Sequence, residues 1–257
     1  MKKVVLWILG ISSICLGIGL LIISYNGGFE IQKKNIDISK TSSIQNIEAI
    51  NITSSSANIF VTPTDGSDIS IRYFGEARSN GKNDPTVTTN EVGSDLNITS
   101  GMSDTAAMYT TLEGFKLEIK IPTAYSKNIK VKSDTGDIEI DSLILKKIEV
   151  SATSGSTNLT NCKGEEQINT NSGDVKIVDS VLENNKTIVS GSGDINLFLP
   201  QNSSLSFIYN TETGIISDLF GLIMQQNDGK HMVGKANDGK YNVSVKTTSG
   251  NLNINKL

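Results

Sequence analysis

The chain has few of the residue types that build catalytic centres or disulfide-stabilised domains. Its 257 residues include one histidine, two cysteines, one tryptophan and four prolines. Cys15 lies within the first apolar segment, so Cys162 has no disulfide partner in the remaining chain and is expected, half-buried, in a loop. His231, between Lys230 and Met232, has no second residue that would complete a triad and is expected at a turn. Stability must therefore come from packing and backbone hydrogen bonds.

Aromatic side chains are scarce as well, at 5% of the sequence, whereas Gly, Ser, Thr, Asn and Asp are abundant. A core without large rings must be built from small aliphatic side chains between many turns, which favours an all-β fold. The formal net charge of -4 is spread along the chain, and no basic stripe is present that would neutralise phosphates. We therefore expect no nucleic-acid partner.

The N-terminus contains a long uncharged segment. Residues 4–24 run for 21 positions without a charge, enough at about 1.5 Å per residue to cross a hydrocarbon layer of roughly 30 Å as a helix. Lys2 and Lys3 precede it and no charge follows until Glu30, so the positive-inside rule places residues 1–3 in the cytoplasm and the remainder outside. We expect a single-pass protein of the cell membrane with an extracytoplasmic domain. A cleaved signal peptide is the alternative, but its apolar core is usually about 7–15 residues long and no A-x-A-like site follows.

A cassette of Ser or Thr, Gly and a small polar residue recurs along the second half of the chain, and its first four glycines are 19, 18 and 20 residues apart. Apolar and polar residues alternate beside each cassette, as at Ile138 and Ile140, and this period of two predicts strands with one buried face. Each repeat is predicted as strand, tight turn, strand and loop. Residues 214–241 interrupt the pattern and are expected to form an insertion or an end cap. The turn glycines are Gly136, Gly155, Gly173, Gly193 and Gly250.

The fixed period decides between two arrangements of these strands. A hairpin meander would not need the same residues on the same side of every turn, whereas a coil with rungs of about 19 residues stacks equivalent residues about 4.8 Å apart. We therefore predict a parallel β-solenoid, or β-helix-like repeat domain, over residues 47–257, with residues 25–46 as a linker. The glycines are expected to hold positive φ, so that Gly193→Val destabilises the domain. Lys186 is expected in a loop, where Lys186→Ala would be nearly neutral.

Further segments complete a pattern that covers roughly residues 47–257. They are the opening Ile47 to Val61, Pro63-Thr64-Asp65-Gly66 before a strand, Leu117 to Pro122, Leu197-Phe198-Leu199-Pro200, and the closing Val243 to Ile254. Together with the cassettes they resemble the DUF4097 family of bacterial adhesin-like proteins with β-strand repeats. The resemblance implies a surface location and a scaffold or binding role. Some members of that family have one N-terminal membrane anchor, some belong to operons that answer cell-envelope stress, and the family offers no catalytic residues to carry over.

The aspartates that follow the glycines are the main polar feature of the repeat. In stacked rungs Asp174 and Asp194 would lie side by side, and two carboxylates ~5 Å apart repel by about 1 kcal/mol in water. A cation would relieve this repulsion, so one interpretation is a weak Ca²⁺ site at these two residues. The other is that Asp suits the turn itself, which fits Ser156 and Asn251 in equivalent positions because both also form turns. We expect no bound metal and no cofactor.

Polysaccharide lyases and hydrolases also use β-solenoids, so an enzyme acting on envelope glycans is the alternative function. Such enzymes need paired carboxylates in a cleft, or a basic residue beside a metal. Glu165-Glu166 is the only adjacent acidic pair, and with Lys163 and Gly164 it is expected in a solvated loop. We therefore expect no enzyme but a membrane-anchored, extracytoplasmic scaffold or binding protein of the bacterial cell envelope. Its expected partner is cell-wall glycan or another envelope protein.

Overall fold

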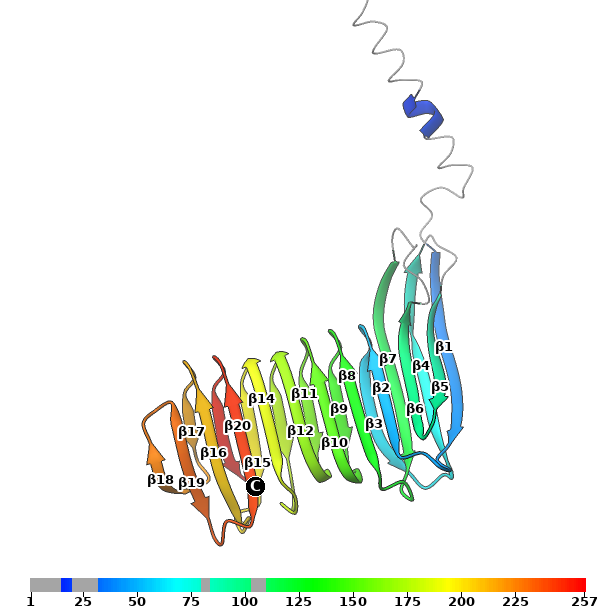
Figure 1. The fold of residues 1–257 in the computed structure, drawn as a ribbon. Coiled ribbons are helices and arrows are strands. Elements are labelled where there is room, and N and C mark those ends of the chain that lie inside the picture. The colour runs from blue at the N-terminus through cyan, green and yellow to red at the C-terminus, as the bar shows by residue number, and fades with distance from the viewer. Residues whose placement is uncertain (1–14, 20–31, 80–83, 103–109) are drawn as a thin grey trace, which may run out of the picture.

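Figure 1 shows the computed structural model, which describes residues 15–19, 32–79, 84–102 and 110–257. Of the predicted transmembrane segment 4–24, only Cys15–Gly19 belongs to these residues, and it is helical. The predicted cytoplasmic residues 1–3 and the remainder of the segment lie outside the described residues. Within the described ranges, no helix has both the length and the apolar character needed to cross a bilayer. The membrane segment therefore stays a prediction.

The described part of the chain forms 21 strands in two sheets, so the predicted all-β class is confirmed. Sheet A has 10 strands in the order β1-β4-β7-β3-β9-β11-β13-β15-β21-β17. Sheet B has 11 strands in the order β18-β19-β16-β20-β14-β12-β10-β8-β2-β6-β5. In chain order the strands are β1 (Gln32–Ser43), β2 (Ala49–Ser54), β3 (Asn58–Thr64), β4 (Asp68–Ser79), β5 (Pro85–Val92), β6 (Asp95–Met102), β7 (Thr110–Pro122), β8 (Asn128–Ser133), β9 (Ile138–Asp141), β10 (Ile144–Ala152), β11 (Thr157–Thr160), β12 (Lys163–Ser172), β13 (Val175–Val178), β14 (Lys186–Ser192), β15 (Ile195–Leu199), β16 (Leu205–Thr211), β17 (Ile216–Asp218), β18 (Ile223–Asn227), β19 (His231–Ala236), β20 (Tyr241–Thr247) and β21 (Leu252–Lys256).

A rung consists of one strand of sheet B, a corner, and one strand of sheet A. The strand pairs β2/β3, β8/β9, β10/β11, β12/β13 and β14/β15 are such rungs, and neighbouring rungs stack in parallel within both sheets. Their register follows the predicted period, because Ile148 lies opposite Ile129 and Ile188 lies opposite Ile168. The prediction of parallel strands stacked at intervals of about 19 residues is therefore confirmed for this stretch.

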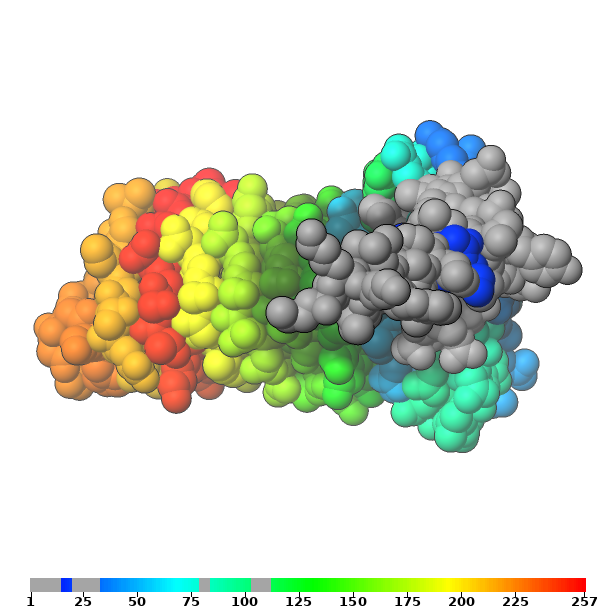
Figure 2. All heavy atoms as spheres, turned by 90° about the horizontal axis from the view of Figure 1, so that it is seen from above, coloured from blue at the N-terminus to red at the C-terminus, as the bar shows by residue number. Residues whose placement is uncertain are grey.

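The rungs do not stack in the order of the chain. β2/β3 lies between β8/β9 and the later strands β6 and β7, which continue the two sheets on its other side. At the far end, β20/β21 lies between β14/β15 and β16/β17, although it comes last in the sequence. In Figure 2 the red C-terminal strands accordingly form a band between the yellow and the orange parts of the body. Both β2/β3 and β20/β21 are thus inner rungs, which corrects the expectation that each turn stacks on the preceding one.

Antiparallel strands extend both ends of the array. On the N-terminal side, β4 pairs with β7 and β1 with β4 in sheet A, while β5 pairs with β6 in sheet B. β1 begins at Gln32, so part of the segment 25–46 that was expected as a linker is an edge strand of the fold. At the other end, residues 214–241 contain β17 of the last rung as well as the antiparallel pair β18 and β19. This segment is therefore both a rung and an end cap.

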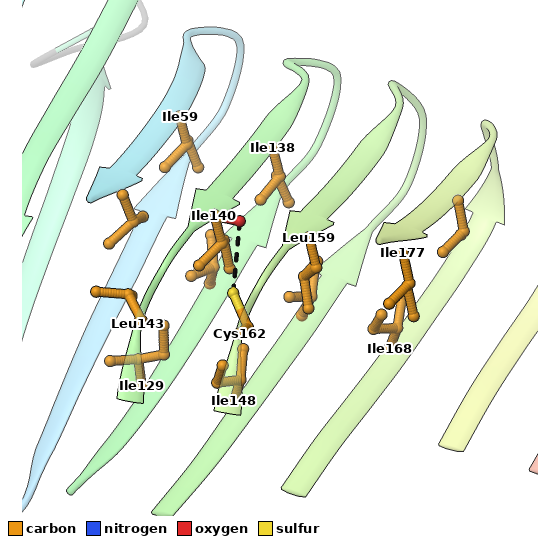
Figure 3. Close-up of a cluster of buried hydrophobic side chains, with 14 of the residues drawn as sticks. Ile59, Ile129, Ile138, Ile140, Leu143, Ile148, Leu159, Cys162, Ile168 and Ile177 are labelled. Atoms are coloured by element: carbon orange, nitrogen blue, oxygen red, sulfur yellow. Dashed lines mark hydrogen bonds between the residues drawn. The ribbon is translucent and has the colours of Figure 1, made fainter. Parts of the chain in front are cut away.

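The core lies between the two sheets and is built from aliphatic side chains that repeat from rung to rung. Figure 3 shows isoleucine and leucine side chains of both sheets pointing into the space between them, and the labelled residues are buried. Buried and exposed positions alternate along the strands, for example in β8 from Asn128 to Ser133. Because successive side chains of a strand point to opposite faces, the outer faces of both sheets carry the polar residues.

At each corner, the backbones of neighbouring rungs approach closely. A Cβ atom on Gly136 would lie 2.1 Å from the carbonyl oxygen of Ala57, and one on Gly250 would lie 1.8 Å from that of Gly193. Both distances are far below van der Waals contact, so no side chain fits there. The corner residues stack in one line, which we call the corner column: Ala57, Gly136, Gly155, Gly173, Gly193, Gly250 and Gly214.

Positive φ explains only some of these glycines. Gly136 and Gly250 do not have a positive φ, so that expectation was wrong for them. Gly214 was not recognised in the repeat pattern, yet a Cβ atom on it would lie 2.0 Å from the carbonyl oxygen of Gly250. Close backbone approach is therefore the requirement that the glycines share. Positive φ is found at three of the predicted positions, with +99°, +127° and +109° for Gly155, Gly173 and Gly193.

We expect Gly136→Ala to destabilise the domain by at least about 1–3 kcal/mol, because the added methyl group overlaps the Ala57 carbonyl and the rungs must separate. The matched control is Gly66→Ala, since Gly66 also lacks a positive φ and its Cβ would meet only Thr64 at 3.5 Å. That variant should be neutral or more stable by up to about 1 kcal/mol. The free energy of unfolding in urea measures both, and equal values would contradict the close-approach explanation.

Candidate functional site

The aspartates of the repeat lie beside the corner column and bind the backbone of the next rung. Asp174 Oδ1 accepts the N–H of Asp194 at 2.8 Å, and Asp194 Oδ1 accepts the N–H of Asn251 at 3.1 Å and its Nδ2 at 3.0 Å. Asp137 Oδ1 accepts the N–H of Ser156 at 2.8 Å in the same way. Each carboxylate thus pairs a backbone donor at the start of the neighbouring strand. These hydrogen bonds from backbone to side chain therefore link neighbouring rungs along the corners.

The structure places Asp174 and Asp194 in neighbouring rungs, as the period predicts, and backbone groups account for their bonding. Within the residues that the structure describes, no group of three or more His, Cys, Asp or Glu side chains has the arrangement of a metal site. Two carboxylates from neighbouring corners would supply too few ligands for Ca²⁺, which takes about six to eight oxygens. These aspartates therefore have a visible structural role, and no observation adds a calcium site to it.

Buried hydroxyl groups form a second line behind the corner. Ser54 Oγ accepts the N–H of Ala57 at 3.0 Å, and Thr247 Oγ1 accepts the N–H of Gly250 at 2.8 Å. Each hydroxyl stands three residues before its member of the corner column, and this spacing in the sequence could have revealed the line. The hydroxyls of Ser54 and Thr247 thus pair N–H groups that the corner buries, whereas Thr170 Oγ1 has no hydrogen-bond partner among the described residues. Its buried members are Ser54, Ser133, Thr170, Ser190, Thr211 and Thr247.

The outer face of sheet B carries a shallow groove of about 320 Å³ that crosses four neighbouring rungs. Lys147 Nζ lies 2.6 Å from Glu149 Oε1, and Lys130 Nζ lies 3.8 Å from Glu149 Oε2. The hydrogen bond to Glu149 raises the pKa of Lys147, so this lysine stays protonated. We call this feature the sheet B groove, and its lining residues are Ala49, Asn51, Asn128, Ile129, Lys130, Lys146, Lys147, Glu149 and Glu165.

The sheet B groove offers ordered donors and an excess of positive charge. Three lysines line it against two glutamates, and one of these glutamates is already paired with two of the lysines. Asn51 Nδ2 donates to Asn97 Oδ1 at 3.1 Å, which fixes the orientation of the Asn51 amide. Such a surface can hydrogen-bond hydroxyl and amide groups and attract carboxylates or phosphates. The sequence did not predict this groove, because its residues come from four separate rungs.

Three charged side chains lie in the core, where the sequence predicted none. Lys186 Nζ is 2.7 Å from Glu166 Oε1 and 2.7 Å from Asp179 Oδ2. The exposed fractions of the three side chains are 2%, 0% and 1%. Glu166 of β12 and Lys186 of β14 lie opposite each other in sheet B, whereas Asp179 follows β13 of sheet A. We call these three residues the buried triad.

The buried triad combines two carboxyl groups with one ammonium group. Burial raises the pKa of Glu166 to about 7, and Lys186 opposes this shift while Asp179 adds to it. Burial also raises the pKa of Asp179. The pKa of Lys186 is lowered by burial but raised more strongly by the two carboxylates, so the net shift is upward. Near neutral pH one carboxyl group therefore keeps a proton, which removes the uncompensated negative charge from the core.

Two predictions are corrected by the buried triad. Glu165-Glu166 was expected in a solvated loop, but both residues belong to β12, and only Glu165 is exposed. Lys186 was also expected in a loop, but it is the first residue of β14 and is buried. The alternation of side chains contained the signal, because Glu166 and Lys186 each stand two residues before an inward isoleucine. The general expectation that charged side chains are exposed led to the opposite prediction.

The remaining candidate nucleophile and base are not brought together. Cys162 is buried rather than half-buried, its Sγ donates to the carbonyl oxygen of Ile140 at 3.5 Å (Figure 3), and burial raises its pKa to about 12. It is therefore a protonated thiol with a structural contact. His231 begins β19, directly after a turn, and its Nδ1 lies 2.6 Å from Asn210 Oδ1. Among the described residues, no hydrogen bond or ion pair links this imidazole to an acid or to Cys162.

We expect Lys186→Ala to lower the free energy of unfolding by about 3–5 kcal/mol, because it leaves two carboxyl groups in the core without their cation. Lys132→Ala is the control, since Lys132 is exposed on the same sheet and should change stability by no more than about 0.5 kcal/mol. Thermal and urea unfolding of both variants measure the difference. A nearly neutral Lys186→Ala would restore the loop assignment and contradict the buried triad.

Stability should also fall as pH rises from about 4.5 to about 7, the unfolded and folded pKa values of Glu166. The pKa is raised in the folded state, so the folded protein keeps a proton in this window that the unfolded chain loses. The contribution is complete below the unfolded pKa, and its loss amounts to at most about 1.4 kcal/mol per pH unit. Glu166→Gln should flatten this slope, whereas Glu165→Gln should not. If the free energy of unfolding of the two variants depended on pH in the same way, a raised pKa of Glu166 would be excluded.

The comparisons with known proteins concern most of the chain. The family model of Toastrack DUF4097 matches residues 47–190 and again residues 126–255. No curated protein matches the chain. A solved structure from Clostridium sporogenes, described as a "putative cell adhesion protein", is similar over 87% of this chain and 100% of that one, with 15% identity and a TM-score of 0.56. At this identity the likeness concerns the fold alone.

Two further solved structures are less similar. A "putative adhesin" from Bacteroides fragilis aligns with 85% of this chain and 97% of its own, at 14% identity and a TM-score of 0.45. A "putative lipid binding protein" from Parabacteroides distasonis aligns with 86% of this chain and 96% of its own, at 11% identity and a TM-score of 0.31. Neither likeness is close enough to support an inference about what this chain binds.

Proposed function

The chain belongs to the Toastrack DUF4097 family, and from this premise we propose that it is an extracytoplasmic scaffold whose sheet B groove binds an anionic cell-wall glycan. In this proposal residues 4–24 hold the protein in the cell membrane, with residues 1–3 in the cytoplasm and the β-domain outside. The observation that carries the proposal is the sheet B groove, with its three lysines and its oriented asparagine. A role in the response to envelope stress is compatible with it.

The architecture supports binding to a long polymer. Parallel stacking repeats the outer side chains of sheet B about every 4.8 Å, so donors from successive rungs can contact successive groups of an extended chain. The groove lies on strands rather than on loops, and its side chains are therefore held in place before binding, which lowers the entropic cost of association. The description of the Clostridium sporogenes protein as a "putative cell adhesion protein" agrees with such a role.

The chemistry of the groove favours an anionic, hydroxyl-rich partner. Lys130, Lys146 and Lys147 all line the groove, and Glu149 neutralises only part of their charge. Cell-wall glycans carry carboxylate or phosphate groups together with hydroxyl and amide groups, which match these donors. Another envelope protein with an acidic surface is the second candidate partner. Its binding would survive enzymatic removal of glycan, and that difference separates the two.

A polysaccharide lyase or hydrolase is the alternative that we set aside. Such an enzyme needs free carboxyl groups in contact with the polymer. The closely spaced acids Glu166 and Asp179 are enclosed in the core, and Glu149 of the groove is paired with lysines. The proposal is therefore a protein that binds its partner without changing it.

Protoplasts that carry the full chain should capture fluorescent peptidoglycan fragments with attached teichoic acid from the medium, and protease added outside should abolish the capture. Lys130→Glu with Lys147→Glu should weaken binding at least tenfold, because it reverses the charge of the groove, and the wild-type affinity should fall with rising salt. Lys132→Glu with Lys246→Glu, two exposed lysines of sheet B outside the groove lining, is the charge-matched control and should bind like wild type. Equal loss in both variants would reject the groove, and capture that resists protease would reject the outside location.

A further inference from the structure

The buried triad holds an amine and a carboxyl group in contact in a place from which water is excluded. Lys186 Nζ lies 2.7 Å from Asp179 Oδ2, which is one bond from the carboxyl carbon Cγ, and less than 3% of either side chain is exposed. Reacting atoms about 3–3.5 Å apart in a fixed orientation correspond to effective concentrations far above any reached in solution. An amine and a carboxylic acid at such a distance have the geometry for condensation to an amide.

The surroundings favour the amide over the separated groups. In water an amine and an acid remain ionised, but in the apolar core burial raises the pKa of both carboxyl groups, so that they accept a proton more readily than in water. The structure provides a second acid at the right place, because Glu166 Oε1 is also 2.7 Å from Lys186 Nζ. An amide removes two charges from the core, and bulk solvent is not in contact with it to hydrolyse it.

We propose that Lys186 and Asp179 form an intramolecular amide bond without any external enzyme, with Glu166 as the proton carrier. Lys186 gives one proton to the carboxylate of Asp179 and, as a neutral amine, attacks Cγ of the resulting carboxylic acid. The carboxylate of Glu166 takes a second proton from the attacking nitrogen and passes it to the oxygen of Asp179 that already carries the first. The Nζ–Cγ bond forms, the bond from Cγ to that oxygen breaks, and one water molecule leaves. No oxidant, reductant or metal is needed.

Asp179 is better placed than Glu166 to form the amide bond with Lys186, because the two acids come from different sheets. Glu166 and Lys186 are register neighbours in adjacent parallel strands, so their side chains run side by side from the same sheet. Asp179 comes from the end of β13 in the opposite sheet, and its N–H donates to the carbonyl oxygen of Phe198 at 3.0 Å, which holds its backbone in place. A bond from Lys186 to Asp179 therefore joins sheet B to sheet A and closes the outer loop 180–185 into a ring.

Tryptic peptides of the folded, full-length protein test this bond directly. An unmodified chain is cut after Lys176, Lys186 and Lys230, which yields peptides 177–186 and 187–230. With the amide bond Lys186 is no longer a tryptic site, and the expected product is one peptide of residues 177–230 that is lighter by one water molecule. Fragmentation should place the bond between Lys186 and Asp179. Two separate peptides of full mass from wild-type protein would overturn the proposal.

Variants separate the cross-link from other dehydrations. Asp179→Asn should give a linked peptide of the same mass as wild type, because ammonia leaves in place of water, whereas Asp179→Ala and Lys186→Arg should give no link. Glu166→Gln should slow the reaction about a hundredfold, since an amide cannot carry the proton. Water loss in peptide 177–186 with normal cleavage at Lys186, or a bond mapped to Glu166, would count against the proposal. The wild-type result decides even if a variant fails to fold.

Discussion

The spacing of about 4.8 Å between stacked strands is the constraint on which the rest of this structure depends. Every rung must turn from sheet B to sheet A at the same place, so the corners come as close together as the strands themselves. The carbonyl oxygen of one corner then occupies the space in which the next corner would carry its Cβ, as at Ala57 and Gly136. In most corners a glycine leaves space for this carbonyl oxygen. A hydroxyl three residues earlier, as at Thr247, or a carboxylate just after the glycine, as at Asp174, pairs backbone groups at the corner.

Local features of the fold could be predicted because they repeat. The spacing of Gly136, Gly155, Gly173 and Gly193 predicts the length of a rung. The alternation of apolar and polar residues beside each glycine predicts which face of each strand is buried. The order of the rungs could not be predicted in the same way. Equivalent strands present nearly the same aliphatic column to any neighbour, so the exchange of positions at β2/β3 and β20/β21 depends on contacts between distant residues that no local pattern records.

The candidate sites were less predictable than the fold, for a different physical reason. A lysine on the outside of sheet B, such as Lys130, and a lysine inside it, such as Lys186, have the same chemistry in the sequence and opposite surroundings in space. Charged side chains are usually exposed, so Lys186 and Glu166 were predicted to face solvent. Their spacing of two residues from an inward-facing isoleucine nevertheless indicated that they face the core. Only the neighbouring acid in the adjacent strand makes the inner position tolerable, and that neighbour is 20 residues away. The sheet B groove is likewise assembled from side chains of successive rungs.

The late rung β20/β21 has a consequence for how the domain is made. A ribosome delivers β14, β15, β16 and β17 before β20 and β21, yet the finished array needs β20/β21 between the two earlier pairs. During synthesis β16 can already pair with β19, but the edges of β16 and β17 that face β20 and β21 in the finished array stay unpaired. Direct pairing of β16/β17 with β14/β15 would leave no place for the last strands. The array therefore cannot close by simple growth from one end. The strands β16 to β21 cannot all pair correctly until β20 and β21 have been synthesised. This end of the array therefore folds in a single late step and not by the addition of one rung after another.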